Sequence, residues 1–91
     1  MKILANDGIS QTGIDDLTQN GFEVITVNVS QEQLVDYINK NDIIGLLVRS
    51  ATTAKRDLID SCPGLKLIGR GGVGMDNIDV EYAKSKGLHV I

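Results

Sequence analysis

The sequence predicts an α/β domain built on a flavodoxin-like, doubly wound parallel sheet of five strands in the order 2-1-3-4-5. Apolar, β-rich runs alternate along the whole chain with polar segments of helical spacing, which indicates five strands separated by four helices. Residues 43–48 read Ile-Ile-Gly-Leu-Leu-Val and are apolar on both faces, as a central strand covered by helices on both sides requires. A strand at each end of the chain favours the flavodoxin-like order, since parallel strands are joined by right-handed crossovers.

Turn and capping residues bound the first elements. The first strand ends in the turn cluster Asn6-Asp7-Gly8. In the helix that follows, Ser10 or Thr12 can accept a hydrogen bond from a free backbone N–H of the first turn, and Gly21 closes the helix. The second strand begins directly after this glycine, where β-rich apolar residues resume.

A capping box predicts the start of the second helix. Residues 30–33 read Ser-Gln-Glu-Gln, in which the two end residues can each satisfy the other's free backbone N–H. The helix then runs to about Lys40 and turns Leu34, Tyr37 and Ile38 toward the core.

Proline and glycine end the helices of the second half. Pro63-Gly64 stops the third helix and Gly87 stops the fourth, and an apolar run of strand type follows each of them. The predicted strands are residues 2–6, 22–27, 43–48, 65–69 and 88–91. The predicted helices run from residue 10 or 12 to about 20, from 30 to 40, from 55 to 61 and from 80 to 86.

Composition excludes several classes of function. A net charge of −3 and only three aromatic residues argue against binding to nucleic acid. No apolar run approaches the ~20 residues of a membrane span, so we expect no membrane partner and a cytoplasmic location. Cys62 is the only cysteine, which we expect to be a buried structural thiol, and we expect no metal site. The 91 residues predict one domain over residues 1–91.

A ligand is expected at the carboxyl ends of strands one and three, where the winding of the sheet reverses. The segments that reach this edge are residues 6–8, 49–52 and 70–74. Arg49 offers a fork of donors suited to carboxylate or phosphate, and Ser50 adds a hydroxyl. The glycines of the last segment let successive backbone N–H groups face one anion. The sequence therefore predicts a site for a small anion.

Residues 69–74 read Gly-Arg-Gly-Gly-Val-Gly and match the G-x-G-x-x-G pattern of dinucleotide-binding loops. That fingerprint belongs on the first strand-to-helix turn of its domain, which here is Asn6-Asp7-Gly8. The acidic ribose ligand should follow about 20 residues later, where residues 88–91 read Leu-His-Val-Ile. We therefore expect the glycines to bind an anion and not a dinucleotide.

Four other polar residues are candidates for functional groups. Asp7 would suit a phospho-receiver domain, but such a domain also needs an aspartate at the end of strand three, where the chain has Val48-Arg49-Ser50. His89 on the last strand is expected to be a packed or edge histidine and not a general base. Asp76 and Asn77 are expected to be caps that hold the glycine loop and not ligands.

Two motifs carry a resemblance to a known family. Residues 47–52 read Leu-Val-Arg-Ser-Ala-Thr, and residues 69–79 read Gly-Arg-Gly-Gly-Val-Gly-Met-Asp-Asn-Ile-Asp, with 21 positions from Arg49 to Arg70. Together with residues 84–91, they resemble the D-2-hydroxyacid dehydrogenases, and within that family the phosphoglycerate dehydrogenase branch. The resemblance covers the whole chain. Many relatives carry Ala and Thr where this chain has Gly71 and Val73.

The resemblance implies that the chain is the first part of a substrate-binding domain. The family transfers a hydride between NAD and a 2-hydroxy or 2-oxo acid, with a histidine as acid–base. It implies that Arg49 and Ser50 face the substrate, and that the amides of Gly72, Val73 and Gly74 hold its carboxylate, with Val73 also near the nicotinamide. No catalytic residue is expected in residues 1–91. The nucleotide-binding domain and a C-terminal segment that completes the substrate domain are expected to lie outside them.

A second hypothesis is a free-standing flavodoxin-like binding or scaffold module. Its specific version is a mononucleotide or flavin site, against which the scarcity of aromatic residues argues. Under the first hypothesis, residues 1–91 alone are expected to be inactive and to bind no NAD. They are also expected to form a homodimer through apolar surface that a completing segment would otherwise cover.

Overall fold

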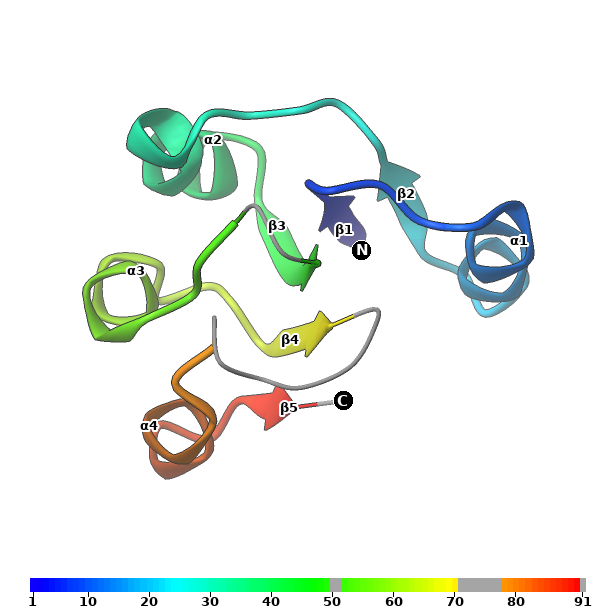
Figure 1. The fold of residues 1–91 in the computed structure, drawn as a ribbon. Helices are drawn as coiled ribbons and strands as arrows, with labels where there is room; N and C mark the ends of the chain where they lie inside the picture. The colour runs from blue at the N-terminus through cyan, green and yellow to red at the C-terminus, as the bar shows by residue number, and fades with distance from the viewer. Residues whose placement is uncertain (50–51, 71–77, 91) are drawn as a thin grey trace.

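The computed structural model describes residues 1–49, 52–70 and 78–90. A parallel sheet of five strands runs through it in the order β2-β1-β3-β4-β5, which confirms the predicted topology (Figure 1). The strands are β1 Lys2–Ala5, β2 Glu23–Ile25, β3 Ile43–Val48, β4 Leu67–Arg70 and β5 His89–Val90. The helices are α1 Gln11–Gln19, α2 Leu34–Lys40, α3 Arg56–Ser61 and α4 Val80–Ser85, with a 3₁₀ turn η1 Gln31–Gln33 before α2.

The helices are divided unequally between the two faces of the sheet. In Figure 1, α1 lies on one side, next to β2, and α2, α3 and α4 lie on the other. The main core cluster has members in the central strands and in each of these three helices, all at most 5% exposed. They include Leu46, Ile68, Ile38, Leu58 and Ala83. Burial of this apolar surface is the principal force that holds the helices to the sheet.

The central strand passes closely between its neighbours at Gly45. The register pairs Gly45 with Ile3 of β1 and Leu67 of β4. A Cβ atom at this position would lie 2.9 Å from Cγ1 of Ile3 and 3.1 Å from Cδ2 of Leu67. Because Gly45 has no side chain, the side chains of Ile3 and Leu67 can pack directly over β3.

The predicted capping box is not formed. The Ser30 side chain makes no capping hydrogen bond, and residues 31–33 form the 3₁₀ turn instead. The Gln31 side chain reaches a distant loop, where its amide nitrogen donates to the carbonyl of Thr53 (3.0 Å) and its oxygen accepts from the N–H of Thr53 (2.9 Å). Gln31 thus joins the 3₁₀ turn to the loop that contains Thr53.

β3 has the predicted bounds, while the other strands differ from theirs, most of all β2 and β4. β2 covers three residues because it pairs only with β1, through three register partners from Lys2–Glu23 to Leu4–Ile25. Residues 26–27 have no partner in β1, and Val27 is 51% exposed. β4 begins two residues later than predicted because the N–H of Leu65 donates back to the carbonyl of Cys62 in a turn (3.1 Å).

Side-chain caps start two of the helices. Ser10 caps α1 by accepting from the N–H of Gly13 (3.2 Å), which decides between the two predicted caps. Asp79 caps α4 by accepting from the N–H of Tyr82 (3.2 Å). Asp76 and Asn77, which were also expected to act as caps, lie outside the described residues.

Several single-residue predictions are confirmed. Leu34 and Ile38 are buried, and Tyr37 is partly buried against the core. Cys62 is buried, and this burial raises the pKa of its thiol to about 11. His89 is exposed at the end of the sheet.

The described residues contain neither a helix that could span a membrane nor a cluster of metal ligands. None of the helices in them has the length and apolar character that crossing a membrane requires. Within the same residues, no group of three or more His, Cys, Asp or Glu side chains could hold a metal ion.

Candidate functional site

The candidate site lies at the carboxyl edge of the central strands. The N–H of Asn6 donates to the carbonyl of Leu47 (3.1 Å), so β1 and β3 remain paired to their ends. On the other side of β3, Arg70 at the end of β4 is the register partner of Val48. The three segments predicted to bind a ligand therefore begin at one edge of the sheet, which is where parallel sheets bind ligands.

Asp7 ties the turn after β1 to the turn after β3. Its Oδ2 atom accepts from the backbone N–H of Arg49 (2.7 Å) and from that of Thr52 (3.0 Å). Its Oδ1 atom accepts from the hydroxyl of Thr52 (2.6 Å). One carboxylate thus holds residues on both sides of residues 50–51.

A buried pair of polar side chains supports this carboxylate. Asn6 and Thr52 are 3% and 4% exposed. The amide nitrogen of Asn6 donates to the Thr52 hydroxyl oxygen (2.9 Å) and to the carbonyl of Val29 (2.8 Å), while its oxygen accepts from the N–H of Val29 (2.6 Å). Buried polar groups with satisfied hydrogen bonds make a rigid, specific arrangement. This network joins the ends of β1 and β3 to the connection that follows β2.

The predicted site residues are only partly described. Arg49 lies where it was predicted, with an exposed side chain directly after β3. Ser50, Gly72, Val73 and Gly74 lie outside the described residues. That the amides of the glycine segment face Arg49 therefore remains a prediction.

Residues 71–77 are flanked by chain that lies beside the β3–α3 connection. At one end, Arg70 pairs with Val48. At the other end, Ile78 forms a parallel bridge with Ala54, and the N–H of Asp79 donates to the carbonyl of Ala54 (3.1 Å). The residues that flank 71–77 on both sides, Arg70 and Ile78, therefore lie next to the segment that carries Arg49.

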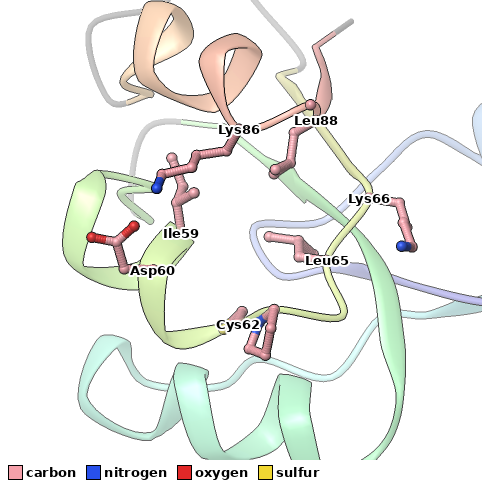
Figure 2. Close-up of a pocket in the computed structure, with 9 residues that line it drawn as sticks. Ile59, Asp60, Cys62, Leu65, Lys66, Lys86 and Leu88 are labelled. Atoms are coloured by element: carbon pink, nitrogen blue, oxygen red, sulfur yellow. The ribbon is translucent and has the colours of Figure 1, made fainter.

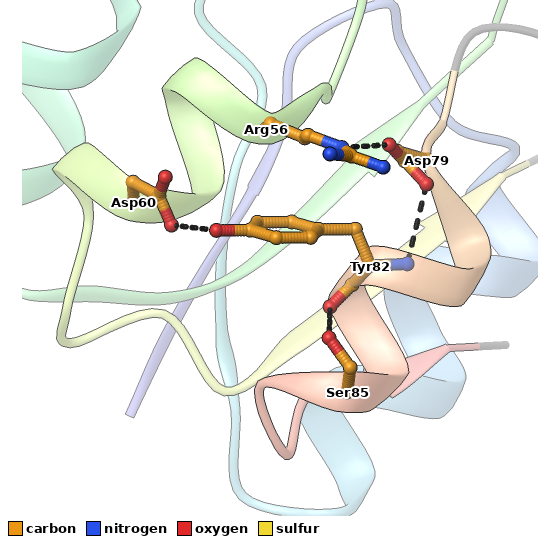
Figure 3. Close-up of polar contacts among 5 residues, drawn as sticks. All are labelled: Arg56, Asp60, Asp79, Tyr82 and Ser85. Atoms are coloured by element: carbon orange, nitrogen blue, oxygen red, sulfur yellow. Dashed lines mark hydrogen bonds and ion pairs between the residues drawn. The ribbon is translucent and has the colours of Figure 1, made fainter.

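A polar network fixes the helix that follows the glycine segment (Figure 3). Nε of Arg56 lies 3.1 Å from Oδ2 of Asp79, and its guanidinium lies 4.9 Å from the centroid of the Tyr82 ring. The Tyr82 hydroxyl donates to Oδ1 of Asp60 (2.5 Å). These contacts join α3 to α4, so the start of α4 has a defined position relative to the site.

The same contacts shift two pKa values. The hydrogen bond from the Tyr82 N–H and then that from Arg56 hold the pKa of Asp79 below its usual value, because both favour the carboxylate. The hydrogen bond to Asp60 raises the pKa of Tyr82, because it stabilises the protonated phenol. Asp79 is thus a charged cap at neutral pH.

A hollow of about 280 Å³ lies at the end of the strands opposite to the candidate site (Figure 2). It is lined by residues that precede β4 and β5 and by the end of α3, including Leu65, Lys66, Leu88 and Cys62. Lys86 extends across it toward Asp60 in Figure 2. With its raised pKa, the Cys62 thiol is protonated at neutral pH and is a poor nucleophile. Cys62 therefore gives this hollow no reactive thiolate.

Sequence reasoning named the segments at this edge but missed the bonds between them. From the sequence, Asp7 is a candidate only as a phosphate acceptor, and Thr52 has no role beyond its place in a segment at this edge. The available signal was that Asn6-Asp7 and Thr52 follow strands that the predicted order makes neighbours. Polar side chains at adjacent strand ends are candidates for mutual hydrogen bonds.

Comparison with known proteins agrees with this fold. The family model described as "D-isomer specific 2-hydroxyacid dehydrogenase, catalytic domain" matches residues 3–91. D-3-phosphoglycerate dehydrogenase of Methanocaldococcus jannaschii is 41% identical over 91 residues, and that of Archaeoglobus fulgidus is 39% identical over 92. The matches cover all of this chain and 17% of the length of each of these enzymes.

Solved structures agree as well. The TT0316 protein of Thermus thermophilus superposes with a TM-score of 0.83 at 25% identity, over 99% of this chain and 29% of that one. NAD⁺-bound 3-phosphoglycerate dehydrogenase of Entamoeba histolytica has a TM-score of 0.76 at 26% identity, over 100% and 32%. These matches favour the dehydrogenase hypothesis over a free-standing binding module. The chain therefore belongs to the D-isomer specific 2-hydroxyacid dehydrogenase family, and it matches that family's catalytic domain.

Proposed function

We propose that this chain is the first part of the substrate-binding domain of an NAD-dependent D-2-hydroxyacid dehydrogenase, most closely a D-3-phosphoglycerate dehydrogenase. The observation that carries the proposal is the match to D-3-phosphoglycerate dehydrogenases along the whole chain. The exposed Arg49 at the carboxyl edge of the sheet supports it. In the proposed reaction, a hydride passes between the 2-hydroxy carbon and NAD.

Within this chain the proposed role is to hold and orient an anionic 2-hydroxy or 2-oxo acid. We assign the guanidinium of Arg49 and the hydroxyl of Ser50 to the substrate, and the amides of Gly72, Val73 and Gly74 to its carboxylate. The positions of Val48, Arg70, Ala54 and Ile78 support this assignment, because they bring the flanks of both segments together. An arginine fork and a row of amides are a suitable donor set for a carboxylate or phosphate.

NAD does not fit the first strand-to-helix turn of this chain. The Asp7 carboxylate occupies that turn, and its negative charge would oppose a pyrophosphate there. Within residues 1–91 we propose only one contact with the cofactor, at Val73. We place the acid–base histidine outside these residues, so we expect the 91-residue chain alone to show no turnover of 3-phosphoglycerate with NAD.

A chimera tests the proposal. Residues 1–91 would replace the 91 matching residues of the M. jannaschii enzyme, and reduction of NAD would be followed with 3-phosphoglycerate and with lactate. Turnover that prefers 3-phosphoglycerate supports the proposal. A folded chimera that turns over neither substrate contradicts it, and a preference for lactate contradicts the assignment to the phosphoglycerate branch.

We also propose that the 91-residue chain forms homodimers and lies in the cytoplasm. The support for dimers is the unequal covering of the sheet, with α1 next to β2 on one face and three helices on the other (Figure 1). Leu47 and Leu67 are only partly buried. Light scattering at increasing concentration checks the assembly, and a monomer at high concentration would contradict it.

Cell fractionation checks the proposed cytoplasmic location.

A further inference from the structure

We propose that Asp7 is a positioning residue, which holds the β3–α3 turn so that Arg49 is presented to the substrate anion. The inference rests on the proposed function and adds a residue to it that contacts no substrate. Its basis is the set of three hydrogen bonds that the Asp7 carboxylate accepts from Arg49 and Thr52.

The bonds reach across the fold and not along the chain. Arg49 and Thr52 are 42 and 45 residues from Asp7 in sequence. The carboxylate accepts from the backbone N–H of both, so it fixes the peptide of Arg49 at one end of the turn and that of Thr52 at the other. Hydrogen bonds to an ionised carboxylate are shorter and about twice as strong as neutral ones. The direction in which Arg49 leaves β3 is thus set from the end of β1.

Hydrogen bonds from Thr52, which Asn6 supports in turn, hold the Asp7 carboxylate in place. Thr52 Oγ1 donates to Oδ1 of Asp7 and accepts from the amide nitrogen of Asn6. Asn6 is paired through both ends of its amide with Val29. Because Asn6 and Thr52 are almost fully buried, a shift of Asp7 would leave buried polar groups unsatisfied.

This arrangement also explains how an acidic residue can lie at the rim of an anion site. A free carboxylate there would repel the substrate. Here its oxygens accept bonds from two N–H groups and a hydroxyl, which distribute its charge into the turn. The remaining repulsion between the Asp7 carboxylate and the substrate anion is offset by the fixed orientation of Arg49.

Kinetics of the chimera test the role. Asp7→Ala is expected to raise KM for 3-phosphoglycerate about tenfold or more, while KM for NAD stays within about twofold. Asp7→Asn keeps one oxygen that can accept from both N–H groups, so it is expected to recover most of this loss. Asp16→Ala, which removes an exposed carboxylate from α1, is the control and is expected to change neither KM.

A purely structural role for Asp7 would give a different result. Ile68→Val lowers stability through the core and is expected to lower Tm without changing the ratio of the two KM values. If Asp7→Ala lowers Tm and leaves KM for 3-phosphoglycerate unchanged, or raises both KM values equally, the inference is overturned.

A measurement without turnover separates this inference from the proposed function. Amide hydrogen exchange in the 91-residue chain is expected to show about tenfold or greater loss of protection at Arg49 and Thr52 in Asp7→Ala, with Leu46 and Ile68 unchanged. Unchanged protection at Arg49 and Thr52 overturns the inference. If the unsubstituted chimera does not turn over, the proposed function is contradicted, and the exchange result alone then supports or overturns the role of Asp7.

Discussion

At the scale of single residues, the candidate site combines an exposed cation with a buried polar support. Arg49 is exposed at the edge of the sheet, while Asn6 and Thr52 beneath the same turn are buried. We assign the exposed group to the ligand, and the buried groups are bonded to the turn that carries it. Substitutions of the two kinds should therefore have different effects, one on binding alone and the other on binding and stability.

Arg49→Ala is expected to raise KM for 3-phosphoglycerate about ten- to a hundredfold in the chimera, because a charge-assisted bond to a carboxylate or phosphate is lost. Arg49→Lys is expected to recover only part of the loss, since lysine keeps the charge without the planar fork. Steady-state kinetics measure both. Lys40→Ala on α2 removes an exposed cation away from this edge and is the control. An unchanged KM in Arg49→Ala would contradict the assigned role.

Cys62 makes stability depend on pH in the alkaline range. Its pKa is raised from 9.0 to about 11 in the folded chain, so the unfolded chain loses the thiol proton first. The contribution of Cys62 is fully present below pH 9 and decreases as the pH rises toward 11. Urea unfolding at pH 8 and pH 10.5 should therefore show a larger loss of stability in the unsubstituted chain than in Cys62→Ala. Equal losses would contradict the effect of burial.

At the scale of elements, local signals and tertiary contacts compete at the helix starts. Ser10 caps α1 as its sequence pattern predicts, through a bond within the first turn of the helix. The Ser30 side chain makes no capping bond although its local pattern is equally good, and residues 31–33 form a 3₁₀ turn that Gln31 joins to Thr53 of another loop. A capping pattern in the sequence therefore predicts where a helix begins more reliably than which side chain caps it.

Asp79 should hold the start of α4 through both its cap and its ion pair. Asp79→Ala is expected to lower Tm by a few degrees, and Asp79→Ser, which keeps an N-cap oxygen, is expected to lower it less. The lowered pKa of Asp79 means that its contribution is present above its usual pKa and is lost as the pH falls through the lower value of the folded chain. Thermal unfolding at pH 7 and pH 3 checks both, since the difference between Asp79→Ala and the unsubstituted chain should diminish at pH 3.

At the scale of the whole molecule, the close packing of three strands depends on Gly45. Gly45→Ala is expected to destabilise the chain by about 1–3 kcal/mol. The new Cβ would lie 2.9 Å from Ile3 and 3.1 Å from Leu67, which is closer than ordinary van der Waals contact. Gly64→Ala is the matched control, since a Cβ there would meet nothing within 4 Å, and it is expected to change stability by less than about 0.5 kcal/mol. Chemical unfolding measures both, and equal effects would contradict the packing argument.

The sequence by itself determined the number, type and order of the elements, because apolar periodicity, caps and turn residues are local properties of the chain. The strand order followed from the handedness of the connections, and the family from two motifs at a characteristic spacing. The position of Arg49 at the ligand edge could also be predicted, since it follows directly after β3.

Only the tertiary structure decided the length of β2, the contact of Gln31 with Thr53 and the hydrogen-bond partners of Asp7. Each depends on partners that are about twenty or more residues away in the chain: β1 for β2, Thr53 for Gln31, and the β3–α3 turn for Asp7. A side chain near the end of a strand can accept bonds from several neighbours, and which of them it meets is set by register and packing. Sequence patterns therefore predict which residues reach the edge of this sheet, and the fold determines what they hold there.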